Sequence, residues 1–267
     1  MVVLYDYTSN EKSRGRINML TQERHNLILQ VLQERKAVTV TELTKELDAS
    51  ESTIRRDLIT LHEMGKLNKV HGGATVLEDI TSFEADVETK SALNIDEKNE
   101  IGRYAASLIK DDDFVYIDAG TTTLKFVDFI TNKKAVYVTN GFVHAKKLVQ
   151  KGCRAYVIGG ELKLATEALV GAEGIHNIKK YNFTKGFLGT NGISIHQGMT
   201  TPEIEEGLMK KEAAARSYMT YILADHTKFG KVSSVTFASL DQVCIITDYV
   251  PDEKYRQAAI VKEVCKQ

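Results

Sequence analysis

The side chains best suited to binding chemistry lie in a loop that follows a short apolar segment. Residues 114–117 are apolar, and Asp118-Ala119-Gly120-Thr121-Thr122-Thr123 comes next, after which a helical pattern begins. Such a loop offers backbone N–H groups, hydroxyls and the positive end of a helix to an anion, above all to a phosphate. Glycine and threonine also form ordinary turns and helix caps, so this loop alone has two interpretations.

Further polar loops follow apolar segments in the same way, and each taken singly is typical of a turn. They are Thr139-Asn140-Gly141, Gly159-Gly160, Gly189-Thr190-Asn191-Gly192 and the stretch 224–230, which includes Asp225 and Lys228. Ligands of parallel sheets bind at the carboxyl ends of the strands, so the loops together favour one shared pocket. Lys210 or Lys228 would neutralise a phosphate there as a point charge, although a solvated surface position is the other interpretation of each lysine.

The elements that must position these loops alternate in the pattern of an α/β domain. Apolar segments typical of strands occupy 114–117, 135–138, 155–158, 186–188, 221–224 and 243–247. Helical stretches lie between several of them, including 124–130, 142–150 and 205–218. This alternation predicts a mainly parallel sheet with helices on both faces, in a domain that spans 94–267.

A second candidate surface lies nearer the N-terminus, on a helix expected over about 52–64. Ile54, Leu58 and Leu61 fall on one side of a helical wheel, and the opposite side carries Ser52 and Arg56. A helix of this width fits the major groove of DNA, where an arginine pairs with guanine through two hydrogen bonds. We therefore predict that Arg56 reads a base.

Residues around Arg56 have the chemistry of phosphate contacts. The predicted DNA contacts are Ser50, Ser52, Thr53, Arg55, Arg56, Lys69 and His71. The hydroxyl residues at the helix start either cap the helix or donate to phosphate, and Arg55 flanks the base-reading side. Lys69 and His71, on a predicted β-ribbon, would approach the DNA backbone or the minor groove. The other interpretation is a solvated helix face, in which the two arginines pair with nearby acids.

The order of the N-terminal elements predicts a winged helix-turn-helix over 19–75. A helix begins near Gln22, a short helix carries Leu43 and Leu47, and Gly65 ends the third helix before the ribbon. The stretch 76–93 is acidic and aperiodic, so we expect a linker. Residues 1–18 are polar and aperiodic, which predicts a disordered tail, unless Met19 is the true start of the protein.

Composition excludes several classes of protein. Of the 267 residues, 43% are hydrophobic and 27% are charged, and the net charge of -1 means that any nucleic-acid site must be a local patch. The cysteines, Cys153, Cys244 and Cys265, show no metal spacing, so we expect no disulfide framework, no metal and no cofactor. No stretch has the length or apolarity of a membrane span or a signal peptide, so we expect a cytoplasmic protein without a membrane partner.

The stretch Ser50-Glu51-Ser52-Thr53-Ile54-Arg55-Arg56-Asp57-Leu58, with His71-Gly72-Gly73-Ala74 after it, resembles the N-terminal signature of the DeoR family of bacterial transcriptional regulators. The resemblance covers nearly everything from Met19 onwards. It implies a multidomain α+β and α/β fold, with the winged helix-turn-helix joined to a sensor domain similar to ribose-5-phosphate isomerase and glucosamine-6-phosphate deaminase. It also implies two partners, double-stranded operator DNA and a phosphorylated sugar that releases the protein from it.

The same resemblance implies which residues bind the effector, with the 120–123 loop holding the phosphate. The expected effector residues are Asp118, Gly120, Thr121, Thr122, Thr123, Asn140, Asn191, Lys210, Asp225 and Lys228. Within the family, stretches such as 49–54 and 188–192 look most similar to the fructose-operon repressors of low-GC Gram-positive bacteria. That branch implies fructose 1-phosphate as the ligand.

Other functions stay open at this point. An activator has the same sequence features as a repressor, because the sign of regulation depends on where the operator lies. An isomerase or deaminase with a regulatory N-terminal domain would need a general base, and Asp118, Glu203 and Asp225 are candidates, yet the spacing isolates none of them. We expect no catalytic residue, and we expect a homo-oligomer, a dimer or a tetramer, because operators are commonly read by paired heads.

Overall fold

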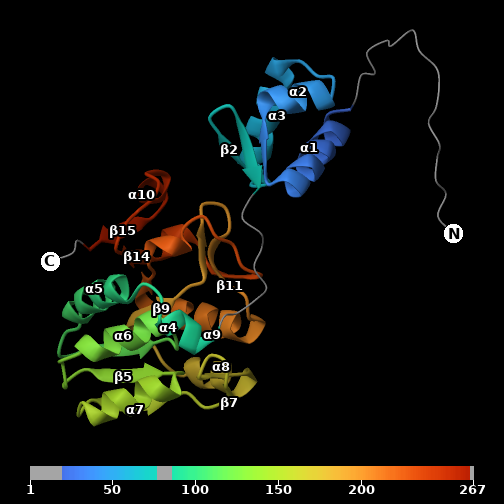
Figure 1. The fold of residues 1–267 in the computed structure, drawn as a ribbon. Helices are drawn as coiled ribbons and strands as arrows, with labels where there is room; N and C mark the ends of the chain where they lie inside the picture. The colour runs from blue at the N-terminus through green and yellow to red at the C-terminus, as the bar shows by residue number, and fades with distance from the viewer. Residues whose placement is uncertain (1–19, 77–85, 265–267) are drawn as a thin grey trace, which may run out of the picture. The chain divides into compact units, whose positions relative to one another are not determined.

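The computed structural model describes residues 20–76 and 86–264 of the chain (Figure 1). The chain divides into two compact units, Met1–Leu77 and Glu78–Gln267, and each unit is described by itself. The tail expected over 1–18 and the possible start at Met19 lie outside the described residues.

The first unit is a winged helix-turn-helix, as predicted. Its elements are α1 (Thr21–Arg35), β1 (Ala37–Thr39), α2 (Val40–Glu46), α3 (Glu51–Glu63), β2 (Leu67–Val70) and β3 (Gly73–Val76). The three strands form an antiparallel sheet in the order β1-β3-β2. Ile28, Leu43 and Ile54, one from each helix, are fully buried in its core.

Local sequence signals set the ends of these helices. Thr39 and Glu42 form a reciprocal capping box at the start of α2, and the Ser50 hydroxyl accepts the Thr53 N–H at the start of α3. Gly65 follows α3 with a φ of 64°, a conformation that glycine adopts without strain. Gly73 is required by packing, because a Cβ there would lie 2.1 Å from the Val38 carbonyl oxygen.

The second unit is built on a seven-stranded sheet in which every neighbouring pair is parallel, as predicted. Its order is β15-β14-β12-β9-β4-β5-β6. The strands are β4 (Phe114–Ile117), β5 (Val136–Thr139), β6 (Arg154–Val157), β9 (Phe183–Gly189), β12 (Ser217–Leu223), β14 (Cys244–Thr247) and β15 (Ile260–Glu263). Two small antiparallel sheets join β7 (Glu161–Lys163) to β8 (Ala168–Val170), and β10 (Gly192–Ser194) to β11 (Gly198–Thr201) and β13 (Val235–Ala238).

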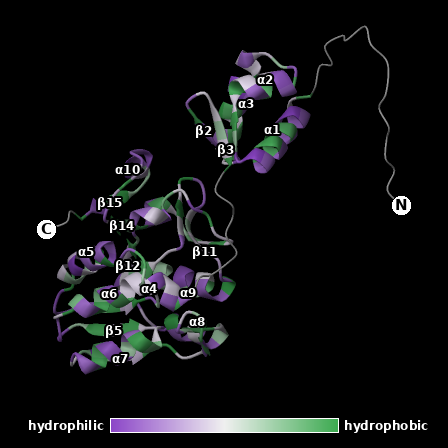
Figure 2. Cartoon of the chain, in the orientation of Figure 1, coloured by the Kyte–Doolittle hydropathy of each residue, from purple (hydrophilic) through white to green (hydrophobic). Residues whose placement is uncertain are grey.

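Helices cover both faces of this sheet. They are α4 (Val87–Ser91), α5 (Ile95–Ser107), α6 (Thr121–Phe129), α7 (Phe142–Gln150), α8 (Ala172–Ile178), α9 (Ile204–Ala215) and α10 (Lys254–Ala258), with short 3-10 turns η1 (His226–Lys228) and η2 (Leu240–Gln242). Figure 2 shows hydrophilic and hydrophobic residues mixed along outer helices such as α7, whereas β5 is mainly hydrophobic.

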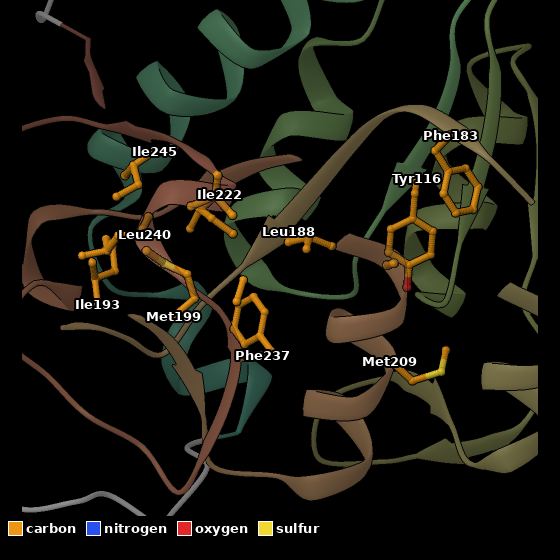
Figure 3. Close-up of a cluster of buried hydrophobic side chains, with 14 of the residues drawn as sticks. Tyr116, Phe183, Leu188, Ile193, Met199, Met209, Ile222, Phe237, Leu240 and Ile245 are labelled. Atoms are coloured by element: carbon orange, nitrogen blue, oxygen red, sulfur yellow. The ribbon is translucent and has the colours of Figure 1, made fainter. Parts of the chain in front are cut away.

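Alternation along the strands separates the core into two layers. Val115 and Ile117 of β4 pack into the cluster that holds Phe126 of α6 and Leu148 of α7. Tyr116, between them, points into the cluster of the other face, which Figure 3 shows with Met209 of α9 and Phe237 of β13. Both faces of the sheet are therefore buried, which explains why its strands are continuously apolar in the sequence.

The segment expected as a linker, 76–93, contains folded structure at both ends. Val76 is the last residue of β3, and α4 occupies Val87–Ser91. The Asp86 carboxylate caps α4 by accepting the Thr89 N–H at 2.7 Å, and the Val87 N–H donates to the Ala165 carbonyl at 3.1 Å. The C-terminal part of the expected linker thus belongs to the second unit. Within the described ranges, no helix is long and apolar enough to cross a membrane.

Candidate functional site

Helix α3 presents the polar face that its periodicity predicts. Ile54, Leu58 and Leu61 are buried, and Ser52, Arg56 and Ile59 are exposed. Between residues 20 and 76, no ion pair holds the Arg56 guanidinium. Its donors are therefore available to an external acceptor.

The hydroxyl groups at the start of α3 contact one another. The Ser50 hydroxyl accepts the Thr53 N–H at 3.2 Å, and it lies 2.9 Å from the Ser52 hydroxyl and 2.8 Å from the Thr53 hydroxyl. Both roles expected for this cluster are thus compatible, because a hydroxyl that caps through its oxygen still has a proton to donate.

Arg55 lies beside the wing formed by β2, β3 and the turn between them. Its guanidinium pairs with Glu51 at 2.5 Å, but both side chains are more than half exposed, so the pair is weak and a phosphate can displace it. Arg55, Lys69 and His71 line one shallow hollow of about 60 Å³. The structure therefore brings together three of the residues predicted to contact phosphate.

A buried ion cluster holds α3 against α1. Asp57 accepts hydrogen bonds from the Arg24 guanidinium at 2.5 and 3.1 Å, and its other contact is the His25 Nε2, at 3.1 Å. The hydrogen bond from Asp57 raises the pKa of Arg24 above its usual value. Asp57 is one of the acids near the two arginines in sequence, but it does not belong to a solvated helix face, because it is only 4% exposed.

In the second unit, a cavity of about 180 Å³ opens at the carboxyl ends of β4, β9 and β12. Seven of the predicted effector residues line it: Gly120, Thr121, Thr122, Asn191, Lys210, Asp225 and Lys228. Its lining also includes Lys90, Lys98 and Lys231, against the two acids Glu206 and Asp225. Lysines thus outnumber acids on its wall, which favours an anionic ligand.

Asp118 lies beneath this cavity rather than on its wall. Its carboxylate is 2% exposed, forms an ion pair with the Lys210 ammonium, and accepts the Gly189 N–H at 3.0 Å. Burial raises the pKa of Asp118, and Lys210 offsets that effect only in part. The pair joins β4, β9 and α9 below the cavity, so Asp118 positions the site instead of lining it.

Asn140 and Thr123 are also supports, which differs from the expectation that they line the cavity. The Asn140 side chain accepts the Ala119 N–H at 2.9 Å and the Tyr116 hydroxyl at 3.1 Å, and it donates to the Leu169 carbonyl at 3.2 Å. The Thr123 hydroxyl is fully buried and donates to the Asp118 carbonyl at 2.7 Å. Both side chains fix the loop that precedes α6.

His144 completes the support of this loop, and no sequence pattern pointed to it. Its Nε2 lies 3.1 Å from both the Gly120 carbonyl oxygen and the Thr123 hydroxyl. Burial lowers the pKa of His144 to about 4, so the imidazole is neutral near pH 7. The loop is therefore held from behind by an uncharged ring, whose Nε2 also lies 3.4 Å from the Gly120 nitrogen at the start of α6.

Two further lysines line the cavity, Lys90 from the segment expected as a linker and Lys98 from the helix that follows it. Lys98 of α5 is buried and its ammonium donates to the Lys90 carbonyl of α4. Burial lowers the pKa of Lys90 to about 8, although Glu206 opposes this effect. Lys90 was not predicted, because 76–93 shows no apolar periodicity that would assign α4 to a domain. Lys98 lies within the expected sensor domain, but no pattern singled it out.

The cavity also gathers the unsatisfied buried side-chain oxygens of the described residues. Across residues 20–76 and 86–264, three buried side-chain oxygens lack a hydrogen-bond partner: Thr166 Oγ1, Glu206 Oε1 and Asp225 Oδ2. All three residues line this cavity. Buried polar atoms are almost always paired in folded proteins, so three such atoms on one wall mark a place for a ligand.

The fold and the site together define a class of protein, the ligand-responsive transcriptional regulators. The chain joins a winged-helix unit with an exposed arginine face to an α/β unit with a cationic cavity. Comparison with protein families agrees. Residues 24–79 match the DeoR-like helix-turn-helix domain, and residues 93–249 match the DeoR C terminal sensor domain. The chain belongs to the DeoR family of DNA-binding transcriptional regulators, so the predicted family is confirmed.

Similar proteins span nearly the whole chain. An HTH-type transcriptional regulator named FruR, from Bacillus subtilis (strain 168), is 42% identical over 250 residues, which cover 92% of this chain and 99% of the relative. The HTH-type transcriptional repressor GlcR of the same organism is 34% identical, over 89% and 92% of the two chains. A lactose phosphotransferase system repressor of Staphylococcus aureus (strain N315) is 32% identical, over 88% and 95%.

Solved structures give a weaker likeness. Ribose 5-phosphate isomerase A from Methanocaldococcus jannaschii aligns with a TM-score of 0.39 and 14% identity, over 51% of this chain and 55% of that one. A probable sor operon regulator from Shigella flexneri aligns with a TM-score of 0.36 and 10% identity, over 55% and 79%. At these scores the likeness carries no argument about activity.

Proposed function

We propose that this regulator represses a sugar-catabolic operon and leaves its operator when a phosphorylated sugar, such as fructose 1-phosphate, fills the cavity of the second unit. The observation that carries the proposal is the cavity wall, which combines an excess of lysines with three unsatisfied buried oxygens. The lysines suit a phosphate, and the oxygens suit the hydroxyls of a sugar. The FruR name of the relative from Bacillus subtilis supports fructose as the sugar.

The phosphate is best placed at the loop before α6. The helix N-terminus, the Thr121 and Thr122 hydroxyls and the lysines of the wall all favour negative charge there. Binding shifts the protein off DNA only if the ligand has different affinities for the DNA-binding and released states. Paired DNA-reading units in a homo-oligomer would provide two such states.

The catalytic alternative receives little support from the site. Glu203, one candidate base, pairs with Lys163 at 2.8 Å, and Asp118 is paired with Lys210. Asp225 keeps a free oxygen, but its pKa lies below the usual value. Burial alone would raise that pKa, and the effects of Lys228, Thr227 and Asn94 outweigh burial. The full-length relatives named above are regulators.

Titration of operator binding tests the proposal directly. The purified protein is bound to the DNA upstream of its own gene and titrated with fructose 1-phosphate, with fructose 6-phosphate and galactose-derived phosphates as controls. Release by fructose 1-phosphate alone is the expected result. Specific binding that no sugar phosphate disturbs would refute the effector, and turnover of a ketose phosphate would refute the repressor in favour of an enzyme.

Arg56→Ala is expected to remove operator preference, because a base-reading arginine contributes about 1–3 kcal/mol of discrimination. Lys69→Ala is the matched control, because it also removes one positive charge, but on the wing. This variant should bind every DNA more weakly, and the salt dependence of its binding should be smaller. Affinities for operator and scrambled duplexes at several salt concentrations measure both effects. Operator preference that survives in Arg56→Ala would remove this residue from the base-reading role.

Thr121→Val combined with Thr122→Val is expected to spare DNA binding and to raise the sugar phosphate concentration needed for release by about tenfold or more, because two hydroxyl donors to phosphate are lost. Valine keeps the shape of threonine, so the loop keeps its packing. The readout is the half-maximal concentration for release from operator DNA. An unchanged value would mean that the loop is only a turn.

A further inference from the structure

Glu206 is the least expected residue on the cavity wall. A carboxylate repels the phosphate that the surrounding lysines attract. Glu206 nevertheless lies in the cavity wall and is only 7% exposed. Its Oε1 has no hydrogen-bond partner within the described chain. A carboxylate accepts hydrogen bonds and donates none, so this oxygen can be satisfied only by a donor.

Helix α9 holds Glu206 rigidly. Gly207, the next residue, packs so closely that a Cβ would lie 2.6 Å from the Val235 side chain of β13. One turn further along α9, Lys210 faces the same cavity, but its ammonium is committed to Asp118 and to the Gly189 carbonyl. Lys210 therefore does not neutralise Glu206. Lys90 of α4 supplies positive charge that acts on this carboxylate, and its Oε1 is still without a hydrogen-bond partner.

Two more acceptors of the same kind share this wall. Asp225 is fully buried, and its Oδ1 accepts the Thr227 N–H at 3.0 Å while its Oδ2 stays unpaired. The Thr166 hydroxyl, in the β7–β8 turn, is also unpaired. The wall thus offers two carboxylate oxygens and one hydroxyl to a ligand, in addition to its cationic groups.

We infer that Glu206, together with Asp225 and Thr166, forms a hydroxyl-reading subsite, and that Glu206 makes the site specific for anions that carry several hydroxyl groups. The inference rests on the proposed function and assigns the hydroxyl specificity of that ligand site to Glu206. A ligand hydroxyl that donates to Glu206 satisfies a buried acceptor, whereas a phosphate without hydroxyls leaves the carboxylate unpaired and adds repulsion.

This arrangement predicts that loss of the Glu206 carboxylate changes the affinities for two kinds of phosphate ligand differently. Glu206→Met removes the acceptor and keeps a side chain of similar length. The affinity of this variant for fructose 1-phosphate should fall about tenfold or more. At about pH 8, propyl phosphate is a dianion with no hydroxyl to donate, and its affinity should stay the same or rise. Isothermal titration calorimetry on the full chain gives both affinities.

The control is Glu205→Met, the same change one position earlier on α9. Glu205 is 46% exposed and pairs with Lys163 at 3.3 Å, so this variant should bind both ligands as the unchanged protein does. Glu206→Met should also melt no lower than the unchanged protein without ligand, since it removes a buried carboxylate with an unpaired oxygen. A normal melting temperature excludes misfolding as the cause of weak binding.

The outcomes separate the two proposals. If the unchanged protein binds no sugar phosphate, the proposed function fails. If it binds one and Glu206→Met binds it equally well, or loses sugar phosphate and propyl phosphate in parallel, the hydroxyl-reading role of Glu206 fails while the proposed function stands.

Discussion

Lys210→Met will destabilise the second unit by about 3–5 kcal/mol, because it leaves a buried carboxylate without its counter-charge. Asp118 is almost fully buried, and Lys210 is its partner in an ion pair whose side chains are 3% and 5% exposed. The Gly189 N–H that remains is a single donor to a charged group. Chemical denaturation of the full chain, followed by circular dichroism, measures the loss.

Adding Asp118→Asn to Lys210→Met supplies the control. The amide oxygen still accepts the Gly189 N–H, and the uncompensated charge is gone, so most of the lost stability should return. The pH dependence has a definite sign. Since burial raises the pKa of Asp118 in the folded state, the deficit of Lys210→Met should be largest above that pKa and shrink as the pH falls toward about 4. An equal deficit in single and double variants would contradict this account.

Asp57→Asn will destabilise the first unit by a similar amount, about 3–5 kcal/mol, because it leaves the Arg24 guanidinium uncompensated in a nearly buried position. The side chains of Arg24 and Asp57 are 12% and 6% exposed. Hydrogen exchange of the α1 and α3 amides reports the stability of this unit within the full chain. Operator affinity should fall in parallel, since Asp57 fixes α3 against α1.

Asp48→Asn makes the same chemical change at an exposed position in the same unit. Asp48 adopts a φ of 46° between α2 and α3, a conformation that asparagine tolerates equally well. Hydrogen exchange of Asp48→Asn should therefore match that of the unchanged protein. Comparable losses in both variants would show that the Asp57 cluster has no special role.

Periodicity made much of the fold predictable. The apolar spacing of α3 and the apolar runs of β4 and β14 reflect burial on one side of a helix or on both faces of a sheet, and such burial leaves a direct trace in the sequence. Three of the five polar loops that follow strands, at 118–123, 189–192 and 224–230, contribute residues to the cavity wall, whereas Thr139-Asn140-Gly141 and Gly159-Gly160 do not. Strand β15 was missed because it is an edge strand with alternating exposure and few apolar residues.

The roles of individual polar residues were harder to predict. Asp118, Thr123 and Asn140 look like ligand contacts in sequence, because a loop residue that supports a site has the same chemistry as one that lines it. Only the hydrogen bonds of the folded chain, such as those that occupy every polar atom of the Asn140 side chain, separate the two roles. Glu206 was missed for the opposite reason, since an acid on an amphipathic helix is usually solvated.

The stability of helix α4 depends on contacts close to the ligand cavity. It has five residues and no buried side chain, so its own propensity cannot keep it folded and its contacts with the second unit must. In two of those contacts the Val87 N–H donates to the Ala165 carbonyl, and the Lys98 ammonium donates to the Lys90 carbonyl. Lys90 also lines the cavity. A ligand that touches Lys90 adds its binding free energy to the helical state of α4, the first described element after β3. Occupancy of the cavity and the stability of α4 are then thermodynamically linked.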